Sequence, residues 1–185
     1  MVIWYDLMPG TYTVEETLPY GWYPTSDPVQ TATLMSDEIW QPNFGNVTNC
    51  IGLTPGYWGN WDNHYTEAQF LVLLQGTIGQ GKTLDTVNNW LSSVGCDGDD
   101  AVHCMRRFLL ANQLTLSLTQ KAGDYPDLFV PTEDGRPVTL FNACQIPGTG
   151  GNLGQWLDEA LAILADPGAY DRDWILEVKN VLDTF

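Results

Sequence analysis

The first 49 residues alternate apolar and polar side chains with the two-residue period of β-strands. The clearest run is Thr11–Glu15, in which Tyr12 and Val14 share one face and two threonines share the other. β-Branched and aromatic residues predict further strands at residues 2–5, 29–35 and 38–44. The last of these is expected to pair back after a turn at Ser36 and Asp37. This part of the chain is therefore predicted to be antiparallel β-structure.

From about Thr66 the apolar residues recur with the 3.6-residue period of helices. Thr66 and Gln69 form a capping-box pattern, in which each side chain satisfies a backbone N–H at the start of a helix. Further helices are expected to begin after Thr83, Asp99 or Asp100, Asn152 and Asp171. A long loop at about 122–151, with a candidate hairpin at 132–140, interrupts this helical half.

The chain has 185 residues and carries 7 Lys and Arg against 23 Asp and Glu, which gives a formal net charge of −16. This charge argues against nucleic acid and anionic lipid as partners, because both attract basic surfaces. No apolar run approaches the roughly 20 residues of a membrane helix, so we expect no membrane insertion. The first basic residue is Lys82, so the whole predicted β half is acidic.

Four cysteines and no C-x-x-C pair argue against a zinc ribbon or a thioredoxin-like site. An even count favours two disulfides and an oxidising compartment, with four free thiols as the alternative. Three pairings are open. We favour Cys96 with Cys104, because they close a short loop, which leaves Cys50 with Cys144.

Two segments of the β half, LMPGTYTVEETLPYGW at 7–22 and NFGN at 43–46, resemble the second half of SdrD B-type and Cna B-type modules of bacterial surface proteins. The resemblance implies an antiparallel β-sandwich of the Ig or prealbumin-like kind, used in rods and stalks. Only the later strands of such a module are present in residues 1–49. We therefore expect either a fragment of a longer protein or a missing strand that another subunit donates.

Glu16 occupies the position of the glutamate that, in Cna B-type modules, promotes a covalent Lys–Asn cross-link. Residues 1–81 contain no Lys, so such a bond cannot form within the β half of this chain. We expect Glu16 to be a strand residue or a turn cap instead.

A third segment, GLTPGYW at 52–58, followed by Asn60 and His64, is similar to the TPGYWKNH segment of a helical domain in secreted prokaryotic proteins. The stretch LANQL at 110–114 and the ending VLDTF also resemble that family. Gly59 and Trp61 stand where the family usually has Lys and His. This resemblance implies an extracellular or cell-surface location, not a particular reaction.

The fold expected from these patterns is α+β. An incomplete antiparallel β-sandwich-type module spans residues 1–49, and an all-α domain spans residues 50–185.

Acidic and aromatic clusters supply the candidate sites. Asp97, Asp99 and Asp100 surround a glycine turn and are a candidate calcium site, and the sequence indicates no other cofactor. The alternative, which we favour, is a helix N-terminus with acidic side chains on its dipole. Asn46 begins an N-x-T glycosylation sequon on an expected exposed linker.

Five aromatic residues crowd into nine positions, and they are Tyr57, Trp58, Trp61, His64 and Tyr65. Aromatic faces beside amides bind sugar rings, whereas a buried wedge joining the two halves is the alternative. We favour the wedge for Tyr57 and Trp58 and expect Trp61 and Tyr65 to be more accessible.

The function we predict is structural: a non-enzymatic building block of a fibre, sheath or adhesin stalk. Its partners would be copies of itself, through strand donation, or other surface-protein domains. The alternative is a carbohydrate-binding module that uses the region of Trp61 and Tyr65 for polysaccharide. A hydrolase fragment ranks below both, because no nucleophile–base pair is recognisable in the sequence.

Overall fold

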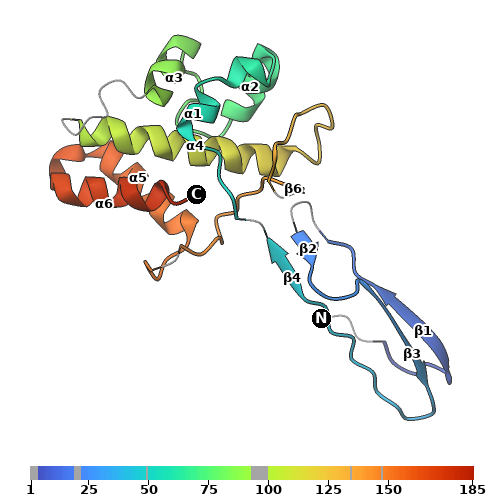
Figure 1. Ribbon diagram of the computed structural model, residues 1–185. Helices are drawn as coiled ribbons and strands as arrows, with labels where there is room; N and C mark the ends of the chain where they lie inside the picture. Colours follow the sequence, from blue (N-terminus) through green and yellow to red (C-terminus); the bar gives the residue numbers. More distant parts are fainter. Residues whose placement is uncertain (1–3, 19–21, 49, 93–99, 134, 147) are drawn as a thin grey trace. The chain divides into compact units, whose positions relative to one another are not determined.

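The computed structural model describes residues 4–18, 22–48, 50–92, 100–133, 135–146 and 148–185. The chain is α+β, as predicted, and it divides into two compact units, residues 1–48 and residues 49–185 (Figure 1).

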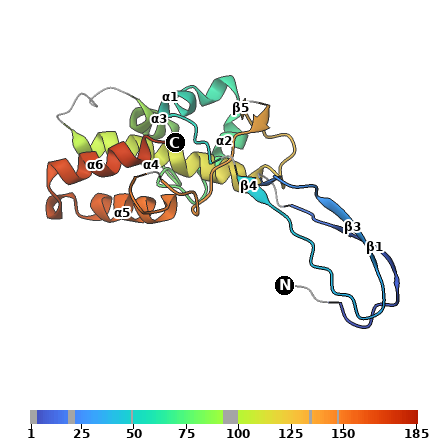
Figure 2. The same ribbon diagram turned by 60° about the horizontal axis from the view of Figure 1, so that its bottom comes forward.

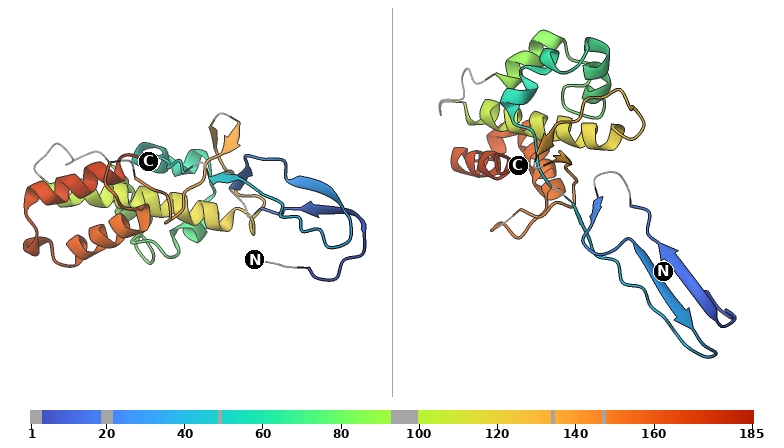
Figure 3. Two further views of the ribbon diagram at one scale, coloured as in Figure 1. Left: turned by 90° about the horizontal axis from the view of Figure 1, so that it is seen from below. Right: turned by 45° about the vertical axis from the view of Figure 1, so that its right-hand side comes forward.

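The described residues of the N-terminal unit form two separate two-stranded antiparallel sheets. β1 (Gly10–Glu15) pairs with β3 (Val29–Leu34), and these two strands run side by side in Figure 3. β2 (Trp22–Pro24) pairs with β4 (Asn46–Thr48). These sheets do not form a sandwich within the described part of the unit.

The β1–β3 hairpin confirms the predicted alternation. Tyr12 and Val14 lie on its half-buried face, whereas Thr11 and Thr13 lie on its exposed face. The exposed face carries two hydroxyl pairs across the strands, with Thr11 and Thr13 bonded to their partners over 3.0 and 2.9 Å. No described residue in this unit is buried as a whole, although single side-chain atoms are, so the unit lacks a core among these residues.

Two strand predictions in this unit are wrong for the described residues. Residues 38–44 form no strand, because the Gln30 side-chain amide binds both the N–H and the C=O of Asn43 in place of a backbone ladder. Trp4 and Tyr5 also lie outside any strand and are 60% and 75% exposed, while residues 1–3 fall outside the described residues.

The C-terminal unit is built around one long helix, α4 (Ala101–Lys121), with the other helices packed on two sides of it (Figures 1 and 2). Three short helices lie on one side: α1 (Pro55–Trp58), α2 (Glu67–Leu74) and α3 (Leu84–Leu91). Two longer helices lie on the other: α5 (Leu153–Ala165) and α6 (Arg172–Leu182).

The two sides of α4 bury two hydrophobic clusters. Leu110, Leu114 and Leu118 pack with Trp58 and Phe70 in the first. Met105, Leu109 and Leu116 pack against α5 and α6 in the second. Because α4 is buried on two sides, its apolar residues are distributed around the helix and contribute to both clusters.

Local capping residues fix where these helices begin. The capping box at Thr66 and Gln69 is present as predicted. The side chains of the other predicted caps each accept a bond from a backbone N–H, and these caps are Thr83, Asp100, Asn152 and Asp171. The predicted hairpin in the long loop is shorter than expected, with β5 (Thr132–Glu133) paired to β6 (Arg136–Pro137).

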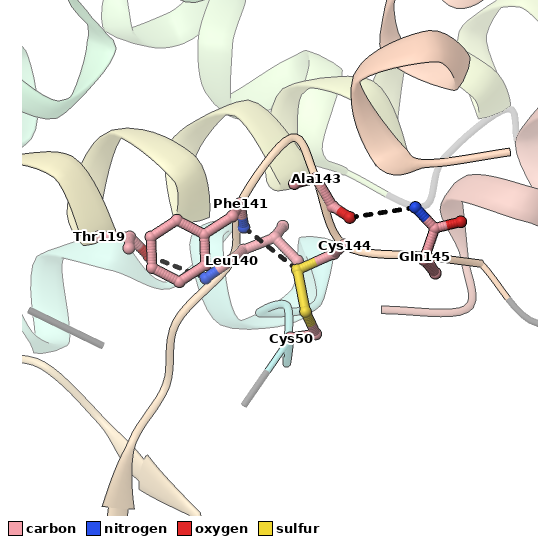
Figure 4. The surroundings of a disulfide bond; sticks show 7 residues. All are labelled: Cys50, Thr119, Leu140, Phe141, Ala143, Cys144 and Gln145. Carbon is pink, nitrogen blue, oxygen red and sulfur yellow. Dashed lines mark hydrogen bonds between the residues drawn. A yellow bond between two sulfur atoms is a disulfide. The ribbon is translucent and has the colours of Figure 1, made fainter. Parts of the chain in front are cut away.

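A disulfide joins Cys50 to Cys144 and confirms that predicted pair (Figure 4). It ties the start of the C-terminal unit to the loop before α5. Cys104 is also disulfide-bonded, and its predicted partner, Cys96, lies outside the described residues.

Candidate functional site

The aromatic cluster after the T-P-G-Y-W motif is mostly buried. Trp58, Tyr65 and Trp61 are only 0%, 4% and 9% exposed. Trp58 stacks on Tyr65 with ring centroids 5.7 Å apart, and Trp61 stacks on Phe70 at 4.3 Å. The expectation that Trp61 and Tyr65 would be the accessible pair is therefore wrong, because their ring faces are covered by the first hydrophobic cluster.

The accessible part of the cluster is a stack of three rings. His64 is exposed and lies parallel to Tyr57 at 4.5 Å and to Phe129 at 5.8 Å. Tyr65 donates its hydroxyl proton to the carbonyl of Phe129 over 2.9 Å, so the Tyr57 hydroxyl donates to Tyr65 over 3.1 Å. Burial raises the pKa of both phenols, which therefore remain donors near neutral pH.

Three polar side chains on α4 fasten other segments to it, and we call Asn112, Thr115 and Thr119 the α4 polar stripe. The Thr115 hydroxyl accepts from the backbone N–H of Leu53 at 3.1 Å and from the Trp58 indole N–H at 3.2 Å. The Thr119 hydroxyl accepts from the N–H of Leu140 at 2.9 Å (Figure 4).

Asn112 completes the stripe at the C-terminal end of α6. Its side-chain amide donates to the carbonyl of Leu182 at 2.8 Å, one of the carbonyls a helix end leaves unpaired. Nearby, Gly52 lies so close to Phe185 that an added Cβ would approach the Phe185 Cβ to 2.8 Å. The three motif segments at 52–58, 110–114 and 181–185 therefore meet at α4, where their contacts hold the helices of this unit together.

Sequence patterns did not reveal Thr115 and Thr119, because a threonine inside an amphipathic helix looks like an ordinary surface residue. Their spacing of four residues on one helix face was the available signal.

The acidic cluster at the start of α4 is only partly described. Asp97 and Asp99 lie outside the described residues. Asp100 caps α4 by accepting from the N–H of His103 at 2.8 Å. The described residues contain no group of three or more His, Cys, Asp or Glu side chains placed to hold a metal ion.

Glu16 and Asn46 face each other in the N-terminal unit. The Asn46 amide donates to Glu16 Oε1 at 2.8 Å. The other two oxygens of this pair, Glu16 Oε2 and Asn46 Oδ1, are buried without a hydrogen-bond partner. Asn46 lies in β4 and its side-chain nitrogen is hydrogen-bonded, so the expectation that it lies on an exposed linker is wrong, whereas glycosylation of Asn46 stays a prediction.

Comparison with known proteins found no matching family model, no matching curated protein and no matching solved structure. The resemblances to SdrD B-type modules and to TPGYW-type domains therefore stay predictions. Among the helices of the described residues, none has both the length and the apolar character that crossing a bilayer requires.

Proposed function

We propose that this chain is an extracellular structural protein, a building block of a fibre, sheath or stalk that assembles by β-strand complementation. The observation that carries the proposal is the outer edge of β1, which no described strand pairs, in a unit whose described residues are all at least partly exposed. An added strand would pair that edge and cover apolar surface at the same time.

The hydrogen-bond pattern identifies which backbone groups point to the edge. Glu16 N–H donates to the carbonyl of Pro28 at 2.9 Å, inside the hairpin. Because inward and outward groups alternate in an antiparallel pair, Tyr12 and Val14 also point inward. Thr11, Thr13 and Glu15 then point outward, and no described residue accepts from their backbone N–H groups.

The outer edge of β3 is less open than that of β1. The outward N–H of Val29 donates to the Asp27 carboxylate at 2.9 Å, and the N–H of Met35 donates to Glu38 at 2.7 Å. Carboxylates that occupy both ends of an edge compete with an incoming strand. We therefore assign the accepting edge to β1.

Exposed apolar side chains support the same assignment of function. Five large apolar residues of this unit are 60–96% exposed, and they are Trp4, Tyr5, Met8, Met35 and Ile39. A partner that covered these side chains would remove their apolar surface from water.

The Glu16–Asn46 pair indicates the chemistry of the donated strand. Two buried acceptor oxygens without donors cost about 1–3 kcal/mol each. A Lys or Arg side chain would satisfy both and would neutralise the carboxylate. Residues 1–81 contain neither, so this basic side chain would come from residues 82–185 of a second copy or from another surface-protein domain. A contact between the second unit of one copy and the first unit of the next, repeated head to tail, propagates into a filament.

Matched variants of two paired threonines test this proposal. Thr13 and Thr31 share one hydroxyl hydrogen bond, so replacing either with proline removes the same side-chain contact. Each proline also removes one outward N–H, which an edge strand tolerates. Thr13→Pro blocks the β1 edge, whereas Thr31→Pro blocks the β3 edge.

We expect light scattering and electron microscopy to find concentration-dependent polymers of the wild type and of Thr31→Pro, and their loss in Thr13→Pro. Polymers that persist in Thr13→Pro would contradict the proposal, as would a wild-type chain that stays monomeric at every concentration.

A further inference from the structure

The C-terminal unit contains a polar cleft of about 260 Å³ that none of the candidate sites uses. Its walls come from the segment after α2, from one face of α4 and from the start of α5. Four carboxamides line it, and they are Gln75, Gln113, Gln120 and Asn142. Asp158 supplies one carboxylate, and the side chains of Leu116, Leu157 and Leu161 supply an apolar surface.

Hydrogen bonds hold the walls of this cleft in place. The Lys121 ammonium donates to the carbonyl of Gln75 at 3.2 Å and to the Ser117 hydroxyl at 2.6 Å. The Gln113 side chain accepts from the N–H of Ile78 at 2.9 Å. Because the walls of the cleft are already fixed, ordering them on ligand binding costs little free energy.

The opposite wall is fixed by Gly154, whose N–H donates to the carbonyl of Asn142 at 2.9 Å. A Cβ at Gly154 would approach the Cβ of Asn142 to 3.1 Å, so the close approach favours glycine.

Several polar groups in the cleft remain available to a ligand. The side chains of Gln75, Gln120, Asn142 and Asp158 are exposed and make no hydrogen bond with other described residues. Each carboxamide offers both donors and an acceptor. Hydroxyl groups are also both donors and acceptors, so a polyhydroxylated ring matches this set.

The charge of the lining residues and the volume of the cleft restrict the class of ligand further. The lining contains a carboxylate but no Lys, Arg or His, and the neighbouring Lys121 ammonium is already bonded to Gln75 and Ser117. This charge distribution disfavours an anion. The volume is below the roughly 300–1,000 Å³ of sites for drug-sized ligands, so the cleft fits one ring and not an extended chain. The leucines can contact the C–H face of such a ring while the amides and Asp158 bind its hydroxyls.

We propose that this cleft binds one ring of a neutral saccharide. The site lies entirely within the C-terminal unit and uses none of the β1 edge. Its success or failure is therefore independent of the assembly proposed above.

Isothermal titration and saturation-transfer NMR of the full chain with cellobiose, maltose and chitobiose test the proposal. We expect at least one of these neutral disaccharides to bind, and glucuronate to bind more weakly. Asp158→Ala should weaken binding by about tenfold, the factor that corresponds to one lost hydrogen bond to a charged group.

Two further variants separate binding from folding. Leu161→Arg places a bulky side chain at a position that is already 39% exposed, and it should abolish binding without unfolding the unit. Asp173→Ala removes a carboxylate on α6 that is 98% exposed and outside the cleft, and it should leave binding unchanged. The proposal is overturned if none of the disaccharides binds, if glucuronate binds as tightly, or if binding survives both Asp158→Ala and Leu161→Arg.

Discussion

The two units of this chain treat their polar and apolar groups in opposite ways. The C-terminal unit satisfies them internally: α4 buries apolar residues on two sides, and its polar stripe pairs with backbone groups of three other segments. In the described part of the N-terminal unit, no strand pairs with the outer edge of β1, and two buried oxygens have no hydrogen-bond partner. A unit of the first kind is self-sufficient, whereas under the proposed function a unit of the second kind is completed by a partner.

Charge follows the same division. Residues 1–48 contain six Asp and Glu and no Lys or Arg, whereas all seven basic residues lie beyond residue 81. The N-terminal unit therefore lacks internal ion pairs, and a basic segment is its electrostatic complement.

Tryptophan truncation should show the largest difference between the units. Trp58→Ala empties a fully buried site and should cost about 3–5 kcal/mol of unfolding free energy. Trp4→Ala makes the same chemical change at a side chain that is 60% exposed, and it should change stability by about 0.5 kcal/mol or less. Urea denaturation followed by circular dichroism measures both values. Equal losses in the two variants would remove the contrast between the units.

Loss of the Cys50–Cys144 disulfide is the next largest effect. The bond spans a sequence separation of 94 within the C-terminal unit. Replacing both cysteines with alanine should destabilise that unit by about 2–4 kcal/mol, because the unfolded chain gains conformational freedom. Thermal melts of the variant and the parent measure the change. An unchanged melting temperature would show that this bond does not hold the unit together.

Part of this architecture follows from the sequence because its causes are local. Thr66 and Asn152 bind backbone groups within a few residues, so the helix starts could be predicted. The hydrogen bonds of Thr115 and the burial of Trp61 could not be predicted, because both depend on contacts with residues far away in the chain. The pairing of β2 with β4 could not be predicted either, because two three-residue strands are too short to show a periodic pattern.

A matched threonine pair sharpens the contrast at single hydrogen bonds. Thr115→Val leaves the N–H of Leu53 and the indole of Trp58 without an acceptor, at a cost of about 1–3 kcal/mol. Thr13→Val removes one exposed hydroxyl pair and should cost about 0.5 kcal/mol or less. Chemical denaturation compares the two. A larger loss in Thr13→Val would mean that the N-terminal unit is the more tightly specified one.

The smallest effect appears only at alkaline pH. Folding raises the pKa of Tyr65, so its contribution is fully present below about pH 10 and is lost as the pH rises above that value. The melting temperature of the wild type should therefore fall more steeply above pH 10 than that of Tyr65→Phe. Parallel slopes for the two proteins would mean that Tyr65 does not ionise on unfolding.

Amide hydrogen exchange along β1 tests the central claim most directly. The account predicts that in the isolated chain the outward amides of Thr11, Thr13 and Glu15 exchange quickly while the inward amides of Tyr12 and Val14 are protected. In assembled material the outward amides should become protected as well, since they would then pair with a donated strand. Outward amides that are already protected in the monomer, or that stay unprotected in the assembly, would contradict strand complementation at β1.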